Sequence, residues 1–473
     1  MHTLIDPATS YYFAQWAFIK LLGLTYLIAF GSLLLQVKGL YGSKGIIPLN
    51  EIFKGIRRNK AYTHFYYTPS LFWLSTSDWM LQGLAIVGII ASILVLCGVA
   101  VSLSLFILFI LYLSYVSACI YFLSFQWDTL LIEVGFIGFL YSLQTPPLPI
   151  ATFLLWLVLF RFIFSSGIVK FLMGSQEWRH LKALEYHYET QPLPNKGAYY
   201  AHQQAAWLVT FSTLMVFIIE IVVPFFIFIS AEMRLMAFAC LVILQIVIMC
   251  TGNYAFFNLL TIALCFPLID DQQLPWSSTF FAPGTHSEQL VLSVVVSSTC
   301  MLWIVLNFFQ FVSLFKPLPV VERVLRFLAP FYIINTYGLF SYMTTQRYEI
   351  EIEGSEDGET WKTYEFRWKP GSLSKAPRQV APYQPRLDWQ MWFASLGTAR
   401  QNPWFYRLIQ RLLDNTPDVV NLLKTNPFPN QPPQYIRALL YIYKFTTLKE
   451  KAETGNWWKR EYLRVYLPPT LKE

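Results

Sequence analysis

The sequence predicts a polytopic α-helical membrane bundle of about nine or ten segments, followed by a small β-rich α+β soluble domain. Hydrophobic residues make up 55% of the 473-residue chain and charged residues only 13%, whereas soluble domains carry charge at about a quarter of their positions. No Asp, Glu, Lys or Arg occurs among the 49 residues of Trp79–Trp127, enough for two spans of roughly 20 residues each. From Arg347 onward, 19 basic and 14 acidic residues occur within 127 positions. We therefore place a transmembrane domain at 1–345 and a soluble domain at 346–473.

Further apolar stretches complete the bundle. A second charge-free run, Leu235–Ile269, is long enough for two short passes or for one pass and a re-entrant piece. The remaining candidate spans are Phe13–Leu35, Trp127–Tyr141, Ile150–Lys170, Trp207–Ser230, Leu290–Phe315 and Phe327–Thr345. The first span lacks a basic region before it and a small-residue cleavage site after it, so we expect an anchor rather than a removed signal.

The distribution of charge between the spans predicts their orientation. The loop Gln36–Ser77 carries six basic residues against Glu51, namely Lys38, Lys44, Lys54, Arg57, Arg58 and Lys60, whereas Asp270–Ser287 carries two Asp and no Lys or Arg. Basic loops stay on the cytoplasmic side, so we expect the first loop inside and the second outside. The basic turn Lys316–Arg326 then lies inside, and Phe327–Thr345 carries the chain out. The soluble domain is thus predicted to be exocytoplasmic.

One polar loop, 171–206, fits this count poorly. Ten spans place it inside, away from the soluble domain. Nine spans, with Tyr254–Phe266 re-entrant, place it on the side of the soluble domain, but the loop Gln36–Ser77 then breaks the charge rule. The side of the soluble domain is the firmer expectation.

The soluble domain shows strand and helix patterns in turn. The segments R-Y-E-I-E-I-E and W-K-T-Y-E-F-R-W alternate at the strand period around Asp357-Gly358, which predicts a hairpin. Tyr435–Thr446 and Trp457–Leu467 have the same pattern and predict two more strands. Three helices are expected between them, at Leu387–Leu396, Trp404–Leu413 and Pro417–Leu423.

The six cysteines all lie in or beside apolar stretches, which indicates small buried side chains rather than disulfides or a zinc site. The chain also lacks an N-x-Ser/Thr sequon and a C-terminal retention signal for the endoplasmic reticulum. These observations favour a bacterial inner membrane.

Ionisable residues inside the apolar spans are candidates for a buried charge network or for chemistry. A charge in lipid costs a few kcal/mol on insertion scales, so such residues pair within the bundle or line a cavity. Four residues meet this description: Asp128, Glu133, Arg161 and Lys170. We expect Arg161 or Lys170 to pair with Asp128 or Glu133, with Lys170 to Glu133 as the first choice.

The loop 171–206 is unusually rich in ionisable and aromatic residues. The residues that stand out are Glu177, Trp178, Arg179, Glu185, His187, Tyr188, Glu189, Gln191 and Pro192. Loop residues of these types serve recognition or chemistry, although a His fixed by neighbouring carboxylates is the commoner case. His187 could act as an acid, a base or a metal ligand, but its spacing from other His matches no metal template. The segment Gln191–Pro194 is expected to be extended and to offer a stiff surface.

A second polar and aromatic group occurs in the soluble domain, at Tyr383, Pro385, Arg386, Asp388, Trp389 and Trp392. These residues either dock the soluble domain onto the bundle or bind a client protein, because Trp, Tyr and Arg dominate contact energies. Arg386 and Asp388 are expected to pair with each other or to cap the helix at Leu387.

The two groups carry a family resemblance. E-Y-H-Y-E-T-Q-P-L-P-N at 185–195 and A-P-Y-Q-P-R-L-D-W-Q-M-W at 381–392, with N-T-Y-G at 335–338 and Q-R-Y-E-I at 346–350, resemble the signature of the lipase maturation factor family. This resemblance implies a non-enzymatic folding or maturation factor in the membrane, with an exported client such as a lipase. In eukaryotic relatives it implies an endoplasmic reticulum membrane with the soluble domain in the lumen. On this interpretation Glu185, His187 and Glu189 share one client-facing surface with Arg386 and Trp389.

An enzymatic alternative rests on a more distant resemblance. F-S-S-G-I-V-K at 164–170, followed by E-W-R, is similar to a segment of the vitamin K-dependent carboxylase and HTTM superfamily, in which a lysine at the Lys170 position acts as the catalytic base. The implied substrate is a lipid or a peptide. However, the span in which those carboxylases carry a working histidine reads Phe125-Gln126-Trp127-Asp128, without His, so the maturation factor is preferred.

The sequence contains no motif that indicates another functional class. The sequence contains no Walker loop, dinucleotide fingerprint or G-x-S-x-G elbow, and we expect no cofactor, no metal and no nucleic-acid partner. A transporter is disfavoured because no inverted repeat is evident.

Overall fold

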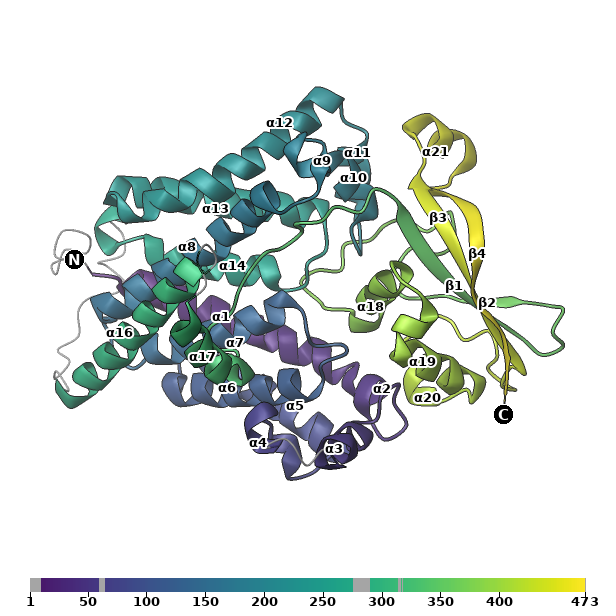
Figure 1. Ribbon diagram of the computed structural model, residues 1–473, viewed down its shortest axis with the longest axis horizontal. Coiled ribbons are helices and arrows are strands. Elements are labelled where there is room, and N and C mark those ends of the chain that lie inside the picture. Colours follow the sequence, from purple (N-terminus) through teal and green to yellow (C-terminus); the bar gives the residue numbers. More distant parts are fainter. Residues whose placement is uncertain (1–9, 59–63, 275–289, 314–315, 317, 473) are drawn as a thin grey trace.

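Long apolar helices form one part of the molecule, and a sheet with helices of its own forms the other (Figure 1). This computed structural model describes residues 10–58, 64–274, 290–313, 316 and 318–472. Within them, seven helices are long and apolar enough to cross a membrane. They are α1 (Tyr12–Leu34), α5 (Asp78–Cys97), α6 (Val101–Ala118), α8 (Pro149–Leu172), α12 (Ala206–Phe217) continued by η2 (Ile218–Val222) and η3 (Val223–Phe228), α13 (Ala231–Thr251) and α16 (Leu290–Ser313). The predicted fold class, a helical membrane bundle with a small soluble domain, is confirmed.

Two shorter helices lie inside the bundle among these seven. They are α7 (Gln126–Tyr141) and α14 (Phe257–Cys265), the latter extended by η4 (Phe266–Leu268). Both are almost wholly buried, so neighbouring helices cover them where lipid would cover a longer span. With them, nine helical segments run between the two ends of the bundle in the described part of the chain.

Hydrogen bonds close the end of the bundle that lies away from the sheet. The carboxylate of Asp271, in η5 (Asp271–Gln273), accepts from the backbone amides of Tyr12 and Phe13 at 2.9 and 3.1 Å. The Gln15 side chain donates to the Tyr141 carbonyl at 2.7 Å. The start of α1, the end of α7 and the segment that follows α14 therefore meet at the end of the bundle that lies away from the sheet.

The expected span Phe327–Thr345 is wrong. The chain instead forms α17 (Pro319–Leu328) and η6 (Ala329–Phe331), and continues irregularly to the first strand. Pro330 has no amide hydrogen for a longer helix, and the next polar residues bond to the bundle rather than to their own backbone. Asn335, for example, donates to the Glu133 carboxylate at 2.9 Å from its side chain.

The predicted separation of the loop Gln36–Ser77 from the soluble domain is also wrong. This loop contains α2 (Val37–Tyr41), α3 (Leu49–Arg58), α4 (His64–Tyr67) and η1 (Leu71–Trp73). Lys38 pairs with Asp418 at 3.2 Å and Glu51 with Arg407 at 2.6 Å, so the loop and the soluble domain lie on the same side. Each of these two loop charges has an oppositely charged partner in the soluble domain, a contact that the charge rule does not take into account. Lys60 and residues 275–287 of the acidic loop lie outside the described residues.

The soluble domain is built on one antiparallel sheet. Its strands are β1 (Arg347–Ser355), β2 (Lys362–Tyr364), β3 (Tyr435–Phe445) and β4 (Trp458–Leu471), in the order β2-β1-β3-β4. The predicted hairpin is confirmed, and Gly358 has the positive φ of 83° that its turn requires. Asp357 accepts from the amides of Glu359 and Thr360, which holds the pKa of its carboxyl well below the usual range.

The three predicted helices are confirmed as α18 (Arg386–Ser395), α19 (Pro403–Leu413) and α20 (Pro417–Val420). The helix η7 (Ala399–Gln401) precedes α19, and α21 (Leu448–Thr454) joins β3 to β4. Figure 1 shows α18 between the bundle and the sheet. This helix is therefore placed to join the two domains.

Candidate functional site

The polar loop 171–206 forms three short helices, α9 (Gln176–Arg179), α10 (Ala183–Thr190) and α11 (Lys196–His202), of which α10 and α11 pack against the soluble domain. Asn195 caps α11 by accepting from the Ala198 amide at 2.9 Å. The segment Gln191–Pro194 is buried, so the exposed stiff surface expected here is wrong. The carbonyls of Gln191 and Pro192 accept from the soluble domain, and that of Leu193 accepts from the Asn253 side chain of the bundle.

Arg347, at the start of β1, is the residue that holds this segment. Its guanidinium donates to the carbonyls of Glu189 at 3.0 Å and Pro192 at 2.9 Å, and also to that of Gln191. Glu349 pairs with Arg347 at 2.5 Å and with Lys369 at 2.8 Å. The sequence analysis missed this buried cluster, although the period of two in R-Y-E-I-E places Arg347 and Glu349 on one face of the strand.

The two signature segments meet as predicted. The Trp392 indole donates to the carbonyl of Thr190 at 2.8 Å, and the Glu189 carboxylate accepts from the Phe445 amide at 2.6 Å. The expectation that they form one open surface is wrong, because Trp389 is only 2% exposed and Arg386 is fully buried. Both serve the junction between the domains.

Arg386 crosses that junction to a carboxylate of the bundle. Its guanidinium lies 2.9 and 3.1 Å from the two oxygens of Asp128 in α7, and it also donates to the Phe122 carbonyl at 2.8 Å. The Tyr112 hydroxyl donates to Asp128 at 2.5 Å. All these charged atoms are shielded from solvent, so the pair is an internal link between the two domains.

The expected pair of Arg386 with Asp388 is therefore wrong. Asp388 accepts from the amides of Trp368 and Lys369 at 2.8 and 2.9 Å, and burial raises the pKa of its carboxyl. Arg386 occupies the first turn of α18, and its side chain is directed at the bundle. The side chain of Asp388 is directed at the soluble domain instead, so the two do not meet. Long-range partners thus replace the local pair.

Aromatic rings complete the junction and favour docking over client binding for this group. Trp389 packs edge-on against Trp127 at 4.8 Å between ring centroids, and it also contacts Phe125 and Tyr254. Tyr383 stands against Trp368 at 6.1 Å, and Pro385 is buried just before α18. The group that includes Trp389 and Arg386 is consequently part of the protein's interior.

Deeper in the bundle, Glu133 and Arg161 form one of the ion pairs that the sequence analysis left open. The second Glu133 oxygen accepts from the Tyr337 hydroxyl at 2.5 Å and the Asn335 side chain at 2.9 Å. Both partners come from N-T-Y-G, so this motif supplies neutral donors to a buried carboxylate. The cluster is internal, and both oxygens of Glu133 accept hydrogen bonds.

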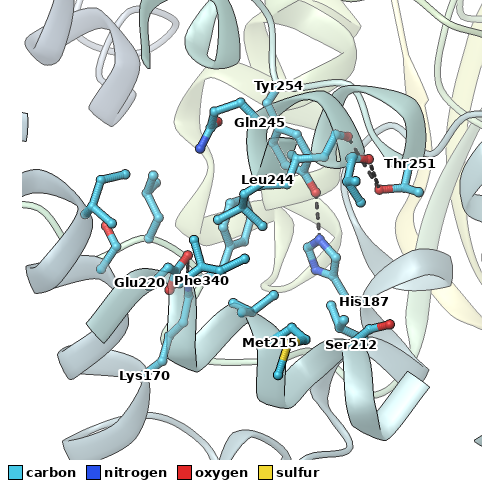
Figure 2. A pocket seen from close by; sticks show the side chains of 18 of the residues that line it. Lys170, His187, Ser212, Met215, Glu220, Leu244, Gln245, Thr251, Tyr254 and Phe340 are labelled. Carbon is cyan, nitrogen blue, oxygen red and sulfur yellow. Dashed lines mark hydrogen bonds and ion pairs between the residues drawn. The ribbon is translucent and has the colours of Figure 1, made fainter. Parts of the chain in front are cut away.

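Lys170 does not pair with Glu133. Its ammonium lies 2.7 and 2.6 Å from the two oxygens of Glu220, in the π-helical turn η2 (Figure 2). The predicted partner is wrong because Lys170 lies about two and a half turns beyond Arg161 on α8, past the level of Glu133. Glu220 was overlooked, although it is the single charged residue of Trp207–Ser230 and for that reason called for a partner.

The residues that follow α8 enclose this ion pair. The Trp178 ring lies 5.2 Å from the Lys170 ammonium, and its indole donates to the Phe340 carbonyl at 2.8 Å. Arg179 donates to the Leu172 carbonyl at 2.9 Å, which closes the end of the helix. Glu177 is bonded by Ser175, and this hydrogen bond lowers the pKa of its carboxyl.

His187 of α10 faces the same region, which the buried Tyr188 also lines, and Glu185 on this helix is half-buried. Its Nε2 lies 2.7 Å from the Tyr254 hydroxyl, which donates to Gln191 at 2.8 Å. Burial, with a smaller contribution from the Lys170 charge, lowers the pKa of His187 to about 4. The imidazole is therefore neutral at physiological pH.

Lys170, Glu220 and His187 line one cavity of 270 Å³ (Figure 2). Its other walls are largely apolar side chains of α8, α12 and α13. The cavity is the place in the described structure where candidate chemical groups reach open space, because the Asp128 and Glu133 clusters are enclosed.

Comparison with known proteins identifies the family. The lipase maturation factor transmembrane domain matches residues 13–276, and the lipase maturation factor C-terminal domain matches residues 333–468. The chain belongs to the lipase maturation factor family. It is 33% identical to lipase maturation factor 2 of Gallus gallus over 95% of this chain and 80% of that protein. With lipase maturation factor 1 of Bos taurus the identity is 32% over 98% and 90%. No solved structure matches the chain.

This membership confirms the family that the signature segments indicated and a place in the membrane. The relatives are vertebrate proteins, so the expected bacterial inner membrane finds no support in them. The signature residues of this chain are chiefly residues of the domain junction.

Proposed function

We propose that this protein is a membrane-embedded maturation factor for exported proteins, with lipases among its clients. The observation that carries the proposal is family membership across both domains, since relatives named lipase maturation factor align with almost the whole chain. The junction supports it as well. A soluble domain held to the bundle by a buried ion pair and by the hydrogen bonds of Arg347 is fixed in orientation, as suits a platform that meets clients at the membrane surface.

We place the client on the exposed edge of the sheet. β4 runs for 14 residues and pairs with β3 along one side, and no strand of the described structure pairs with its other side. Tyr462, Leu463 and Val465 project from it with exposed fractions of 54%, 43% and 46%. An open edge with apolar side chains accepts an extended segment of another chain through backbone hydrogen bonds. Incompletely folded clients present such segments.

We further propose that the soluble domain and the loop Gln36–Ser77 are both exocytoplasmic, as the family resemblance implies. Direct ion pairs between this loop and the soluble domain support a common side for both, because Lys38 and Glu51 have partners there. The enzyme alternative has no supporting observation, since both carboxylate oxygens of Glu220 engage the Lys170 ammonium.

The test is secretion of active lipase from cells that depend on this chain. Leu463→Glu places a charge on the proposed client edge, and Leu448→Glu makes the same change at an exposed leucine of α21. We expect Leu463→Glu to lower secreted lipase activity about tenfold, corresponding to roughly 1.4 kcal/mol of lost contact. Leu448→Glu should have little effect, and both variants should keep the wild-type membrane level. Equal lipase yields for the two variants would reject the β4 edge as the client surface.

A further inference from the structure

The cavity beside Lys170 opens toward the bilayer. Among its lining residues, Phe211 of α12 and Ile243 and Val247 of α13 are 50%, 59% and 50% exposed, and both helices are candidate membrane spans. Side chains that line a cavity and also face outward mark its mouth. The mouth therefore lies between α12 and α13, where lipid chains surround the protein.

The inner end of the cavity is polar but carries no net charge. The Lys170 ammonium and the Glu220 carboxylate neutralise each other at 2.6 Å, and His187 is uncharged at neutral pH. An anionic ligand would meet Glu220 and a cationic ligand would meet Lys170. This environment favours an uncharged head group.

Two groups that line the cavity are ready to bond such a head group. Tyr254 has one hydroxyl hydrogen and donates it to Gln191, so His187 donates to Tyr254 from Nε2. The neutral imidazole then has an acceptor at Nδ1. Gln245 is 4% exposed and lines the cavity, and its Oε1 accepts from Asn258. Within the described part of the chain no acceptor is found for the amide hydrogens of Gln245, which are therefore available to a carbonyl.

We propose that this cavity binds a monoacylglycerol-type lipid, an uncharged amphiphile with one acyl chain, a hydroxyl group and an ester carbonyl. The hydroxyl donates to His187, the ester carbonyl accepts from Gln245, and the acyl chain leaves between α12 and α13. The volume of 270 Å³ lies just below the roughly 300–1,000 Å³ of typical ligand pockets, which suits one chain rather than two. This site is separate from the client edge on β4 and does not depend on it.

The experiment uses the full chain in detergent and a monoacylglycerol with a photoreactive diazirine at the end of its acyl chain. Labelled residues are mapped by mass spectrometry, and competition is measured with unlabelled 1-oleoylglycerol, oleate and lysophosphatidylcholine. We expect labelling on α12 and α13, with 1-oleoylglycerol competing at least tenfold more effectively than anionic oleate and zwitterionic lysophosphatidylcholine. Equal competition by all three would overturn the proposal and leave a lipid-facing groove that does not distinguish head groups.

A matched pair of variants separates the cavity from the general lipid surface. Ile243 and Ile246 are both exposed on α13, but only Ile243 lines the cavity. Ile243→Trp should abolish competitive labelling, whereas Ile246→Trp should retain it. Equal labelling of the two variants would contradict the site. If Ile243→Trp loses its monodisperse profile in size-exclusion chromatography, Gln245→Leu decides: about fivefold weaker competition supports the site, and unchanged competition overturns it.

Discussion

Two buried ion pairs, Asp128 with Arg386 and Lys170 with Glu220, have similar distances but different surroundings. Arg386 and Asp128 have no solvent exposure and gain further bonds from Tyr112 and Phe122. Lys170 and Glu220 bond chiefly to each other, and Glu220 keeps 11% of its side chain exposed beside the cavity. The first pair joins two domains, and the second lies within one domain next to open space. The buried pair of Asp128 and Arg386 therefore attaches the soluble domain to the bundle, whereas the pair of Lys170 and Glu220 borders a site for a ligand.

This contrast predicts that the two pairs differ in what their loss costs. Removing one partner of an enclosed pair leaves a charge that nothing else can reach. Removing one partner beside a cavity leaves a charge that water or a ligand can approach, so the loss is smaller.

The largest effect is expected for Arg386→Met, which leaves Asp128 unpaired inside the junction. The free energy of unfolding should fall by about 3–5 kcal/mol, and the soluble domain should become sensitive to protease. Thermal unfolding in detergent and limited proteolysis measure these changes. Arg407→Met, which breaks the half-exposed pair with Glu51 at the same junction, is the control and should cost no more than about 1 kcal/mol. Similar losses for the two variants would refute the special role of the buried link.

A smaller effect is expected for Glu220→Gln, because the Gln side chain keeps one oxygen that can accept from Lys170 and because position 220 borders the cavity. The expected loss is on the order of 1–3 kcal/mol in the same thermal assay. Glu232→Gln, at an exposed carboxylate that bonds to Ser230, provides the control for the loss of a charge near the bundle. A loss for Glu220→Gln as large as that for Arg386→Met would remove the distinction between the two pairs.

The smallest of the three effects is a pH dependence at the cavity. His187 has a pKa of about 4 in the folded protein, below the value near 6.5 expected in an unfolded chain. The unfolded chain then binds the proton first, so stability is complete above pH 6.5 and falls as the pH drops toward 4. With its side chain half-buried, a loss on the order of 1 kcal/mol is expected. His187→Asn should show a flatter profile over this window, and an unchanged profile would contradict a neutral buried imidazole.

Local patterns predicted the fold well. Alternation around Asp357-Gly358 and the apolar runs of the bundle depend on neighbouring residues, and both appear in the structure. The expected span Phe327–Thr345 failed because hydropathy ignores Pro330 and the polar residues after it, whose bonds go to distant carboxylates.

Prediction of the site was limited for a different reason. The sequence identified Asp128, Glu133, Arg161 and Lys170 as buried charges, but their partners depend on the depth and rotation of each helix. Arg386 and Asp128 are 258 positions apart, and no periodicity links them. Trp389 looked like a contact residue for a client because Trp is frequent at interfaces, and in this protein the interface is internal.

The distance along the chain between Asp128 and Arg386 also sets an order of events during synthesis. Ribosomes add about 5–20 residues per second, so 258 residues take on the order of tens of seconds. Throughout that interval α7 with Asp128 has been synthesised, whereas Arg386, whose guanidinium pairs with Asp128, has not. A nascent chain thus carries an unpaired Asp128 carboxylate in its membrane domain until Arg386, in its last third, has been synthesised. A chain that terminates before Arg386 keeps this carboxylate unpaired. The state of this one carboxylate therefore differs between finished and unfinished copies of the chain.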